Sequence, residues 1–287
     1  MPTKRLRSGF EMPIFGMGTW RMGGDYHYDP SNDDEADIRA IRAAIEIGIT
    51  HIDTAETYAE GHAERLVGQA IKGYDREKLF IVSKVSPEHL RYDDLIASAK
   101  GSLERLETDY LDLYLIHHPN PNIRIVETMR AKDVLVDEGL VKNIGVSNFT
   151  VERLEEAQAH TKNRIVANQL HLNLIYREPE RKGLLEYCQK NDVMFVAWRP
   201  MQKGLLAKRG IKVLDEMCEK YGRSPAQIAI NWLVSQPNVV TLSKMRNVEH
   251  IKENLGAIGW QMDEEDIDRL RRDFPNQQDV SDTVPLI

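Results

Sequence analysis

The chain has 287 residues, of which 41% are hydrophobic and 29% are charged, a composition typical of a globular protein with an ample core. The net charge of −7 at pH 7 argues against a surface that binds nucleic acid or anionic membranes. Met1 is followed by charged residues and no run of roughly 18 apolar residues occurs, so we expect a cytoplasmic protein without a membrane anchor.

The first segments predict a small hairpin followed by a strand. Short stretches on either side of Ser8-Gly9 indicate a β-hairpin, and the residues from Phe15 to Thr19 are typical of a strand. Gly16-Met17-Gly18 resembles the start of a dinucleotide-binding fingerprint, yet Arg21 stands where the third glycine is required. The pattern therefore disfavours a Rossmann fold.

Strands and helices then alternate along the rest of the chain. The further predicted strands are short and mostly apolar, and cover residues 49–53, 79–84, 111–116, 143–146, 165–170, 193–198 and 239–242. The predicted helices have apolar residues at spacings of three and four, and cover residues 31–48 with their caps, 63–72, 92–106, 125–136, 151–159, a segment after Pro179, 212–220, 224–235 and 247–255.

This alternation predicts an α/β fold of the (β/α)8 TIM-barrel type, because eight strand–helix units in roughly 250 residues match that barrel in number and size. The apolar strands indicate burial on both faces, as a parallel sheet requires. Residues 1–287 are expected to form a single domain, with the N-terminal β-hairpin before the barrel and an extra C-terminal helix at about 263–272. The polar tail beyond Pro275 is expected to be loose.

Four side chains that can carry chemistry lie at or just after the ends of predicted strands. Asp53 ends the second strand, Lys84 the third and His117 the fourth, and Tyr58 lies just beyond the second. The carboxyl ends of barrel strands share one rim, so these four side chains can meet in a pocket. Taken singly, each has a plain structural alternative in packing, capping or solvation, but the four together favour a common site.

These residue types suit the reduction of a carbonyl group. A carbonyl that accepts hydride gains charge on its oxygen and must be protonated, and Tyr58 can donate the proton if its pKa is brought from about 10 towards neutrality. We expect the ammonium of Lys84 to lower the pKa of Tyr58, and Asp53 to keep Lys84 charged. His117 would form a hydrogen bond to the substrate oxygen and orient it.

The stretch from His51 to Gly68 also carries a recognisable motif. It reads Asp-Thr-Ala-x-x-Tyr followed by Glu-x-x-Val-Gly, which closely resembles the signature of the aldo-keto reductases. The resemblance extends over essentially the whole chain, from the N-terminal hairpin to Asn254. It implies that the four rim residues form the catalytic tetrad of that family, and that the chain reduces an aldehyde or ketone with a nicotinamide cofactor.

The resemblance further implies a nicotinamide site on the second half of the rim. Gly145 to Phe149 are similar to the family's Gly-Val-Ser-Asn-Phe, whose serine and asparagine, here Ser147 and Asn148, hold the carboxamide. Gln169 matches a glutamine that bonds the same amide, and Trp198 stands where the family usually stacks a tyrosine on the ring. As an isolated motif, the Ser-Asn pair could instead cap the following helix.

Two loops would hold the phosphates. The loop after the seventh strand would lie along the pyrophosphate, although Arg199 replaces the family's serine. After the last strand, Lys244 and Arg246 supply charge for a 2′-phosphate, unless they merely begin a solvated basic helix. NADPH (NADP⁺) is therefore the expected cofactor, with NADH as the alternative. The expected cofactor contacts are Gly18, Thr19, Trp20, Asp53, Ser147, Asn148, Gln169, Trp198, Arg199, Pro200, Gln202, Gly204, Leu206, Ser243, Lys244, Met245, Arg246, His250, Glu253 and Asn254.

The substrate side is expected in the loops after the first, second and fourth strands. The short loop from Pro119 to Ile123 predicts an open pocket for small aldehydes. No metal is expected, because His117 and His118 should point to opposite sides of a strand, and Met17-Gly18-Thr19 stands where metal-dependent barrels carry His-x-His. The candidate substrate contacts are Trp20, Tyr28, Tyr58, His89, His117 and His118.

Two functions fit these predictions. The first is an NADPH-dependent carbonyl reductase, and the second is a nucleotide-sensing regulatory or partner-binding protein on the same scaffold. The intact set of four rim residues favours the enzyme. We expect a small-molecule carbonyl substrate, neither nucleic acid nor membrane as a partner, and a monomer or weak homo-oligomer.

Overall fold

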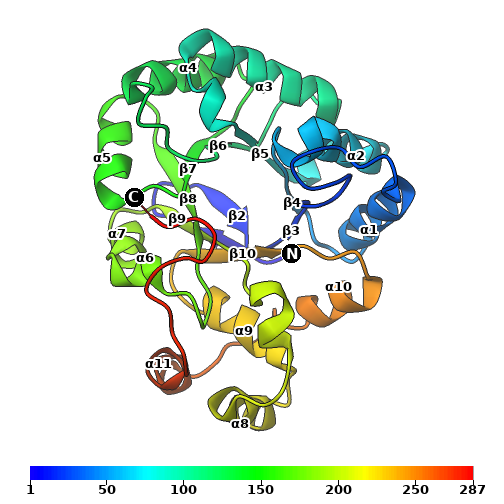
Figure 1. The fold of residues 1–287 in the computed structure, drawn as a ribbon, viewed down its shortest axis with the longest axis vertical. Coiled ribbons are helices and arrows are strands. Elements are labelled where there is room, and N and C mark those ends of the chain that lie inside the picture. Colours follow the sequence, from blue (N-terminus) through cyan, green and yellow to red (C-terminus); the bar gives the residue numbers. More distant parts are fainter. Residues whose placement is uncertain (287) are drawn as a thin grey trace.

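The computed structural model describes residues 1–286, and a closed barrel of eight parallel strands lies at its centre (Figure 1). Around the barrel the strands follow the order β10-β3-β4-β5-β6-β7-β8-β9, so neighbours in the chain are neighbours in space. A separate antiparallel pair, β1 and β2, forms the N-terminal hairpin, and the helix α11 follows the barrel. The predicted (β/α)8 fold with these two additions is therefore confirmed.

The elements agree closely with the predicted segments. The strands are β1 (Thr3–Arg5), β2 (Glu11–Pro13), β3 (Phe15–Gly18), β4 (His51–Asp53), β5 (Phe80–Val85), β6 (Leu113–Ile116), β7 (Ile144–Ser147), β8 (Ile165–His171), β9 (Met194–Trp198) and β10 (Val239–Ser243). The α-helices are α1 (Asp34–Glu46), α2 (His62–Ile71), α3 (Tyr92–Leu106), α4 (Ile125–Asp137), α5 (Val151–Ala159), α6 (Glu178–Arg181), α7 (Leu184–Lys190), α8 (Lys212–Tyr221), α9 (Pro225–Val234), α10 (Val248–Leu255) and α11 (Glu264–Asp273). Short 3-10 helices are η1 (Tyr58–Gly61), η2 (Arg76–Lys78), η3 (Pro87–His89) and η4 (Gln202–Ala207).

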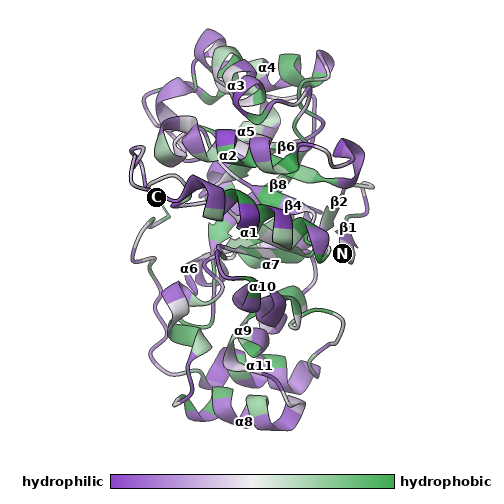
Figure 2. Ribbon diagram, turned by 90° about the vertical axis from the view of Figure 1, so that its right-hand side faces the viewer, coloured by the Kyte–Doolittle hydropathy of each residue, from purple (hydrophilic) through white to green (hydrophobic). Residues whose placement is uncertain are grey.

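The barrel strands are buried on both faces, which explains their nearly unbroken apolar sequences. All seven residues of β8 and all four of β6 are buried. Their outward side chains pack against the helices, whose apolar residues recur along one face, as Leu95, Ala99 and Leu103 do in α3. In Figure 2 the strands β6 and β8 are mostly green, whereas α1 and α8 alternate green and purple along their length.

The N-terminal hairpin closes the amino end of the barrel. Leu6, Phe10 and Met12 are buried in one cluster with inward side chains of the barrel, such as Val82 and Leu113. This packing fills the bottom of the barrel with apolar groups. The carboxyl ends of the strands, on the other rim, are the place where a TIM barrel carries its chemistry.

The tail beyond Pro275 is tied down, so the expectation of a loose tail is wrong. The Gln278 amide donates to the Ile175 carbonyl oxygen at 2.7 Å, and the Leu286 amide donates to Glu178 Oε1 at 3.0 Å. The side chain of Leu286 is also buried. Figure 1 shows the red tail running from α11 past α6 to the C-terminus beside the barrel. Its polar side chains find partners on a distant loop, which composition alone does not reveal.

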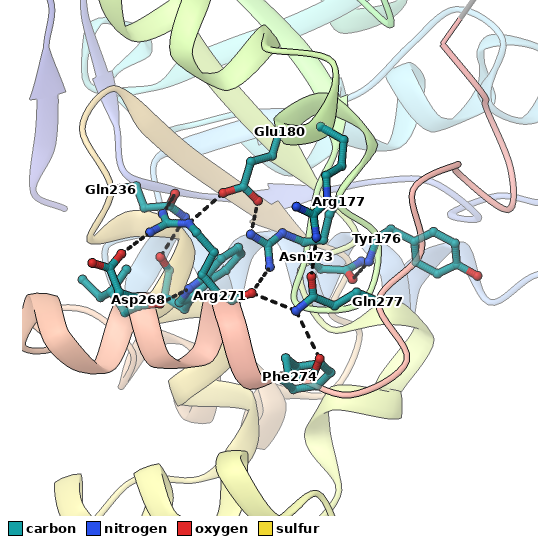
Figure 3. A network of polar contacts seen from close by, with 12 residues as sticks. Asn173, Tyr176, Arg177, Glu180, Gln236, Asp268, Arg271, Phe274 and Gln277 are labelled. Atoms are coloured by element: carbon teal, nitrogen blue, oxygen red, sulfur yellow. Dashed lines mark hydrogen bonds and ion pairs between the residues drawn. The ribbon is translucent and has the colours of Figure 1, made fainter.

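A buried arginine anchors the start of this tail (Figure 3). Arg177, just before α6, is almost fully buried, pairs with Glu180 and lies 4.8 Å from the ring centroid of Trp232. Burial lowers the pKa of Arg177 to about 9. Glu180 also accepts from Arg271 Nε at 2.7 Å, and Gln277 Nε2 donates to the Arg271 carbonyl oxygen at 2.8 Å. The network thus joins α6, α11 and the tail.

Among residues 1–286, none of the helices combines the length and the apolar character that a membrane-spanning segment requires.

Candidate active site

The four residues expected to carry chemistry meet at the carboxyl rim. Asp53 ends β4, Lys84 lies in the adjacent strand β5, His117 directly follows β6, and Tyr58 begins η1. The Lys84 ammonium donates to Asp53 Oδ1 at 2.5 Å and to the Thr54 carbonyl oxygen at 2.9 Å. Its third hydrogen bond, of 3.2 Å, goes to the hydroxyl oxygen of Tyr58. All three donor positions of the ammonium are therefore used, one of them on the phenol.

Burial governs the protonation of this cluster. Lys84 is fully buried and Asp53 nearly so, so each needs the other's charge. Burial lowers the pKa of Lys84, but the contacts with Asp53 and Tyr58 outweigh burial, and the pKa is raised. The pKa of Tyr58 is also raised, because burial outweighs the opposing effect of Lys84. The expected lowering of the Tyr58 pKa is therefore wrong here. The negative charge of Asp53 partly cancels the effect of the Lys84 ammonium on the pKa of Tyr58.

A left-handed turn fixes the position of Tyr58. The next two residues, Ala59 and Glu60, have φ of 49° and 56°, a backbone conformation that non-glycine residues rarely adopt. The Glu60 amide donates to the Tyr26 carbonyl oxygen at 3.1 Å, which ties the turn to the β3–α1 loop. The Tyr26 ring lies 4.8 Å from Trp20, and Trp20 lies 5.0 Å from Tyr58. Tyr26 is a pocket candidate that sequence reasoning missed, since no periodicity marks loop residues.

The two neighbouring histidines lie side by side. The rings of His117 and His118 stack with centroids 4.7 Å apart and planes 13° apart. β6 ends at Ile116, so the alternation of a strand no longer applies and the expected opposite orientation is wrong. Thr57 Oγ1 lies 3.1 Å from His117 Nδ1, and Asn148 Nδ2 lies 3.1 Å from His118 Nδ1. Burial lowers the pKa of both rings, furthest for His117, so both are neutral at pH 7.

A buried polar group adjoins these residues at the ends of β7 and β8. Gln169 Nε2 donates to Asp53 Oδ2 at 2.8 Å, and Ser147 Oγ donates to the Gln169 carbonyl oxygen at 2.9 Å. Asn148 has a left-handed backbone (φ 62°), and its Oδ1 is buried without a hydrogen-bond partner in residues 1–286. A buried orphan acceptor suits a ligand that brings an N–H donor. These residues therefore fit the carboxamide of a nicotinamide.

Trp198 is packed against a residue that sequence reasoning missed. His171 stacks on the Trp198 ring with centroids 4.2 Å apart and planes 11° apart. His171 Nδ1 lies 2.8 Å from Ser281 Oγ in the tail, and burial lowers the pKa of this ring to about 4. His171 stands two residues after Gln169 in the same strand. The two side chains therefore share a face, and this spacing could have identified His171.

The expected pyrophosphate loop carries an acid of the tail. Asp282 Oδ2 accepts from Gln202 Nε2 at 3.1 Å. The same carboxylate lies 3.6 Å from Arg199 Nη1 and 3.9 Å from Lys203 Nζ. Gly204 has a φ of 87°, which lets the loop turn tightly at this point. Arg199 and Lys203, the two cations of the loop expected to lie along the pyrophosphate, thus already share a carboxylate of the tail.

The expected 2′-phosphate cations lie beyond β10. Lys244 and Arg246 are exposed, but Arg246 Nη2 donates to the buried Asp37 of α1 at 2.8 Å. Burial and the cations of Arg246 and Arg21 lower the pKa of Lys244. On α10, His250 and Glu253 are exposed. The other members of the expected cofactor set are buried, namely Gly18, Thr19, Pro200, Leu206, Ser243, Met245 and Asn254.

Two expected substrate residues are engaged elsewhere. The Tyr28 ring packs on His62 at 4.3 Å, and His89 Nδ1 lies 3.0 Å from Glu56 Oε1. Both side chains remain largely exposed. In the part of the chain that the structure describes, no group of three or more His, Cys, Asp or Glu side chains is arranged to hold a metal ion. Trp20, Tyr58 and the stacked histidines are therefore the expected substrate residues that the structure brings together.

Comparisons with known proteins point to one family. The family model described as "Aldo/keto reductase family" matches residues 15–272. The chain is 33% identical to a methylglyoxal reductase of Escherichia coli over 92% of each chain. It is 36% identical to a glyoxal reductase of Bacillus subtilis over 93% of this chain and 91% of the relative.

Solved structures agree with this result. A thermostable aldo-keto reductase in complex with the inhibitor epalrestat superposes with a TM-score of 0.91 at 47% identity, covering 94% of this chain and 99% of the other. An aldo/keto reductase of Klebsiella pneumoniae, solved with NADP and acetate, gives a TM-score of 0.85 at 32% identity over 99% of both chains.

Proposed function

The chain belongs to the aldo/keto reductase family, and from that premise we propose that it uses NADPH to reduce a small aldehyde to an alcohol, with Tyr58 as the proton donor. The observation that carries the proposal is the 3.2 Å hydrogen bond from the buried Lys84 ammonium to the Tyr58 hydroxyl oxygen. A phenol with a cation on its oxygen can release its proton to a neighbouring alkoxide, because the resulting phenolate remains paired.

Because the pKa of Tyr58 is raised, the phenol is a weaker acid than expected, and release of its proton depends on Lys84. At pH 7 the phenol is fully protonated, so it holds the proton that the substrate oxygen needs. Lys84, held by Asp53, supplies its stabilisation only when negative charge appears on the phenol oxygen. The proton moves from the Tyr58 hydroxyl to the oxygen of the former carbonyl. Solvent then returns a proton to the phenolate.

His117 is suited to orient the substrate. The ring is neutral, and its Nδ1 is in contact with Thr57, so Nε2 is the nitrogen that remains for the carbonyl oxygen. A hydrogen bond from Nε2 would place that oxygen beside the Tyr58 hydroxyl, since the two rings lie 5.6 Å apart. The ring would thus polarise the carbonyl without competing for the proton.

The polar group on β7 and β8 would hold the nicotinamide. When bound, NADPH supplies the hydride that adds to the carbonyl carbon. The unpaired Asn148 Oδ1 would accept from the carboxamide, with Ser147 and Gln169 beside it. Gln169 also donates to Asp53, so the same side chain would fix the position of the nicotinamide ring relative to Tyr58. Homologous structures solved with NADP or NADPH support this choice of cofactor.

A small aldehyde is the substrate class that the pocket residues and the relatives favour. The loop after β6 is short, and Trp20 packs edge-on against Tyr58 as one side of the site. Two of the relatives are named for methylglyoxal and glyoxal. A ketoaldehyde of this size needs only the donors at Tyr58 and His117 and an apolar wall to be held.

Turnover of methylglyoxal and of 4-nitrobenzaldehyde, with NADPH oxidation followed optically, tests the proposal. Replacement of Tyr58 by Phe should lower kcat by about 10³-fold, the loss typical of a removed general acid. The dissociation constant for NADPH should change by less than about twofold, since the phenol oxygen is not needed for binding. Tyr74→Phe, which removes a hydroxyl bonded to Glu46 on α1, is the matched control. Undiminished turnover by Tyr58→Phe would exclude the proton-donor role.

A further inference from the structure

The Nε and Nη2 nitrogens of the Arg246 guanidinium are occupied by groups of the chain itself. Its Nε pairs with Asp37 Oδ1, and its Nη2 donates to Asp37 Oδ2 at 2.8 Å. Nη2 also donates to the Arg21 carbonyl oxygen at 2.7 Å and to Asn32 Oδ1 at 2.8 Å. Nη1 alone takes part in none of these bonds. The Nε–Nη2 edge of the guanidinium, one of the edges with which arginine can bind a phosphate, therefore already faces a carboxylate, through a hydrogen bond at Nη2 and an ion pair at Nε.

Asp37 is fixed in place by its neighbours. Its side chain is fully buried, and its Oδ2 accepts from the Gly23 amide at 3.1 Å and from Asn32 Nδ2 at 2.9 Å. It also lies in the first turn of α1, where the helix dipole favours a negative charge. The carboxylate cannot follow Arg246 into solvent. Any phosphate that approaches this arginine therefore meets a pair of opposite charges.

The other cations of this corner are not cancelled in the same way. Lys244 and Arg21 are both exposed. Besides burial, the nearby charges of Arg246 and Arg21 lower the pKa of Lys244. Arg246 differs from them because its Nε and Nη2 nitrogens contact the buried carboxylate of Asp37. Lys244 and Arg21 therefore offer a phosphate more net positive charge than Arg246, whose charge Asp37 offsets.

We infer that Asp37 sets the cofactor preference of this chain by withholding Arg246 from the 2′-phosphate of NADPH, so that NADH is accepted beside NADPH. The inference rests on the proposed function, which places the 2′-phosphate beside Lys244 and Arg246. It assigns a specificity role to a buried helix residue that makes no contact with the nucleotide. The 2′-phosphate is the one group that distinguishes the two cofactors, so a charge at this point changes their ratio.

The experiment measures the dissociation constants of NADPH and NADH by quenching of protein fluorescence in four forms of the whole protein. They are the wild type, Asp37→Asn, Arg246→Gln and the double variant. In Asp37→Asn the arginine is released, and the preference for NADPH should rise about fivefold, the effect of one unit charge at about 4 Å in water. In Arg246→Gln the acid faces the phosphate alone, and the preference should fall by about the same factor.

The double variant is decisive because it removes one charge of each sign. Its preference should stay within about twofold of the wild type, since the local charge is unchanged. A tenfold fall in the double variant would show that Arg246 already serves the phosphate fully, and would overturn the inference. A fall in Asp37→Asn would do so as well, because it would mean that Asp37 positions Arg246 for binding. If Asp37→Asn does not fold, the neutral double variant still decides.

Lys244→Gln is the matched control. It removes a cation that is not paired with a carboxylate within the described residues. The preference for NADPH over NADH should therefore fall about fivefold, both in the presence and in the absence of the Asp37 carboxylate. A wild type that binds neither NADPH nor NADH would contradict the proposed function itself. Binding of both, with a ratio that Asp37→Asn leaves unchanged, would contradict only the inference about Asp37.

Discussion

Lys84 and Arg246 are both cations paired with a buried aspartate at the rim, but the pairing leaves them in different states. Lys84 is fully buried, and after bonding Asp53 it still directs one N–H to the Tyr58 oxygen. The Arg246 side chain is 41% exposed, and Asp37 lies against its Nε and Nη2 nitrogens. In the first pair the cation still contacts the Tyr58 hydroxyl. In the second pair the cation faces a carboxylate of the chain.

The difference indicates how the two halves of the rim are built. On β4 to β6 the charges are set before any ligand arrives, because every donor of Lys84 is already placed. In the loops after β9 and β10, the cations Arg199, Lys203 and Arg246 pair with acids of the chain where phosphates are expected. If the proposed function holds, the half with Lys84 and Tyr58 would act without rearrangement, whereas the half proposed to bind the phosphates would have to exchange partners on binding.

Removing the ammonium of Lys84 should give the largest effect. In Lys84→Met the buried Asp53 loses its partner and the phenol loses its cation. We expect kcat to fall by about 10³-fold or more, and the free energy of unfolding by about 3–5 kcal/mol, the cost of breaking a buried pair.

Steady-state turnover and urea unfolding measure these two losses. Arg246→Gln should cost less stability, because the removed cation is partly exposed and Asp37 keeps its hydrogen bonds from the Gly23 amide and Asn32; it is the comparison variant. A stability loss in Arg246→Gln as large as that in Lys84→Met would remove the distinction between the two halves.

Acid should affect both halves through buried neutral histidines. Burial lowers the pKa of His171 to about 4 in the folded chain, whereas a free histidine has a pKa of about 6.5. Between these two values the ring is protonated in the unfolded chain but not in the folded chain. Stability therefore falls as the pH drops from 6.5 towards 4, by about 2 kcal/mol at pH 5 from His171 alone. His117, whose pKa is also lowered, adds to the loss.

Urea unfolding at pH 7 and pH 5 tests this linkage. His171→Asn should reduce the difference between the two pH values by about 2 kcal/mol. His27→Asn, at a ring that is exposed, should leave the difference as in the wild type. Equal acid sensitivity in His171→Asn and the wild type would show that this ring does not titrate on unfolding.

The smallest expected effect concerns the acid of the tail. Asp282 is partly exposed, so its pairing with Arg199 and Lys203 is screened by solvent. Asp282→Asn should tighten NADPH and NADH alike by about threefold, because both cofactors carry the pyrophosphate. Asp279→Asn, on the same tail but paired with Arg181, is the control. Equal weakening of both cofactors would instead make Asp282 a clamp over the dinucleotide.

Local sequence patterns predicted the barrel and the four rim residues, but not the details that depend on contacts. His117 and His118 stack because β6 ends at Ile116, so neither histidine follows the alternation of a strand. The pKa of Tyr58 is raised because burial, assisted by the Asp53 carboxylate, outweighs the effect of Lys84, a balance that no motif expresses. The tail is fixed because its amides reach Glu178, 108 residues away from Leu286.

The sequence by itself determined the alternation of strands and helices and the residue type at each strand end. Apolar spacing and capping act over a few neighbouring residues, so they can be read directly along the chain. Only the tertiary structure decided which acid meets which cation. Asp37 and Arg246 are 209 positions apart, and the chain has 45 acids and 38 cations among which to choose. The choice is made by the packing of α1 against the loop before α10, which no local pattern contains.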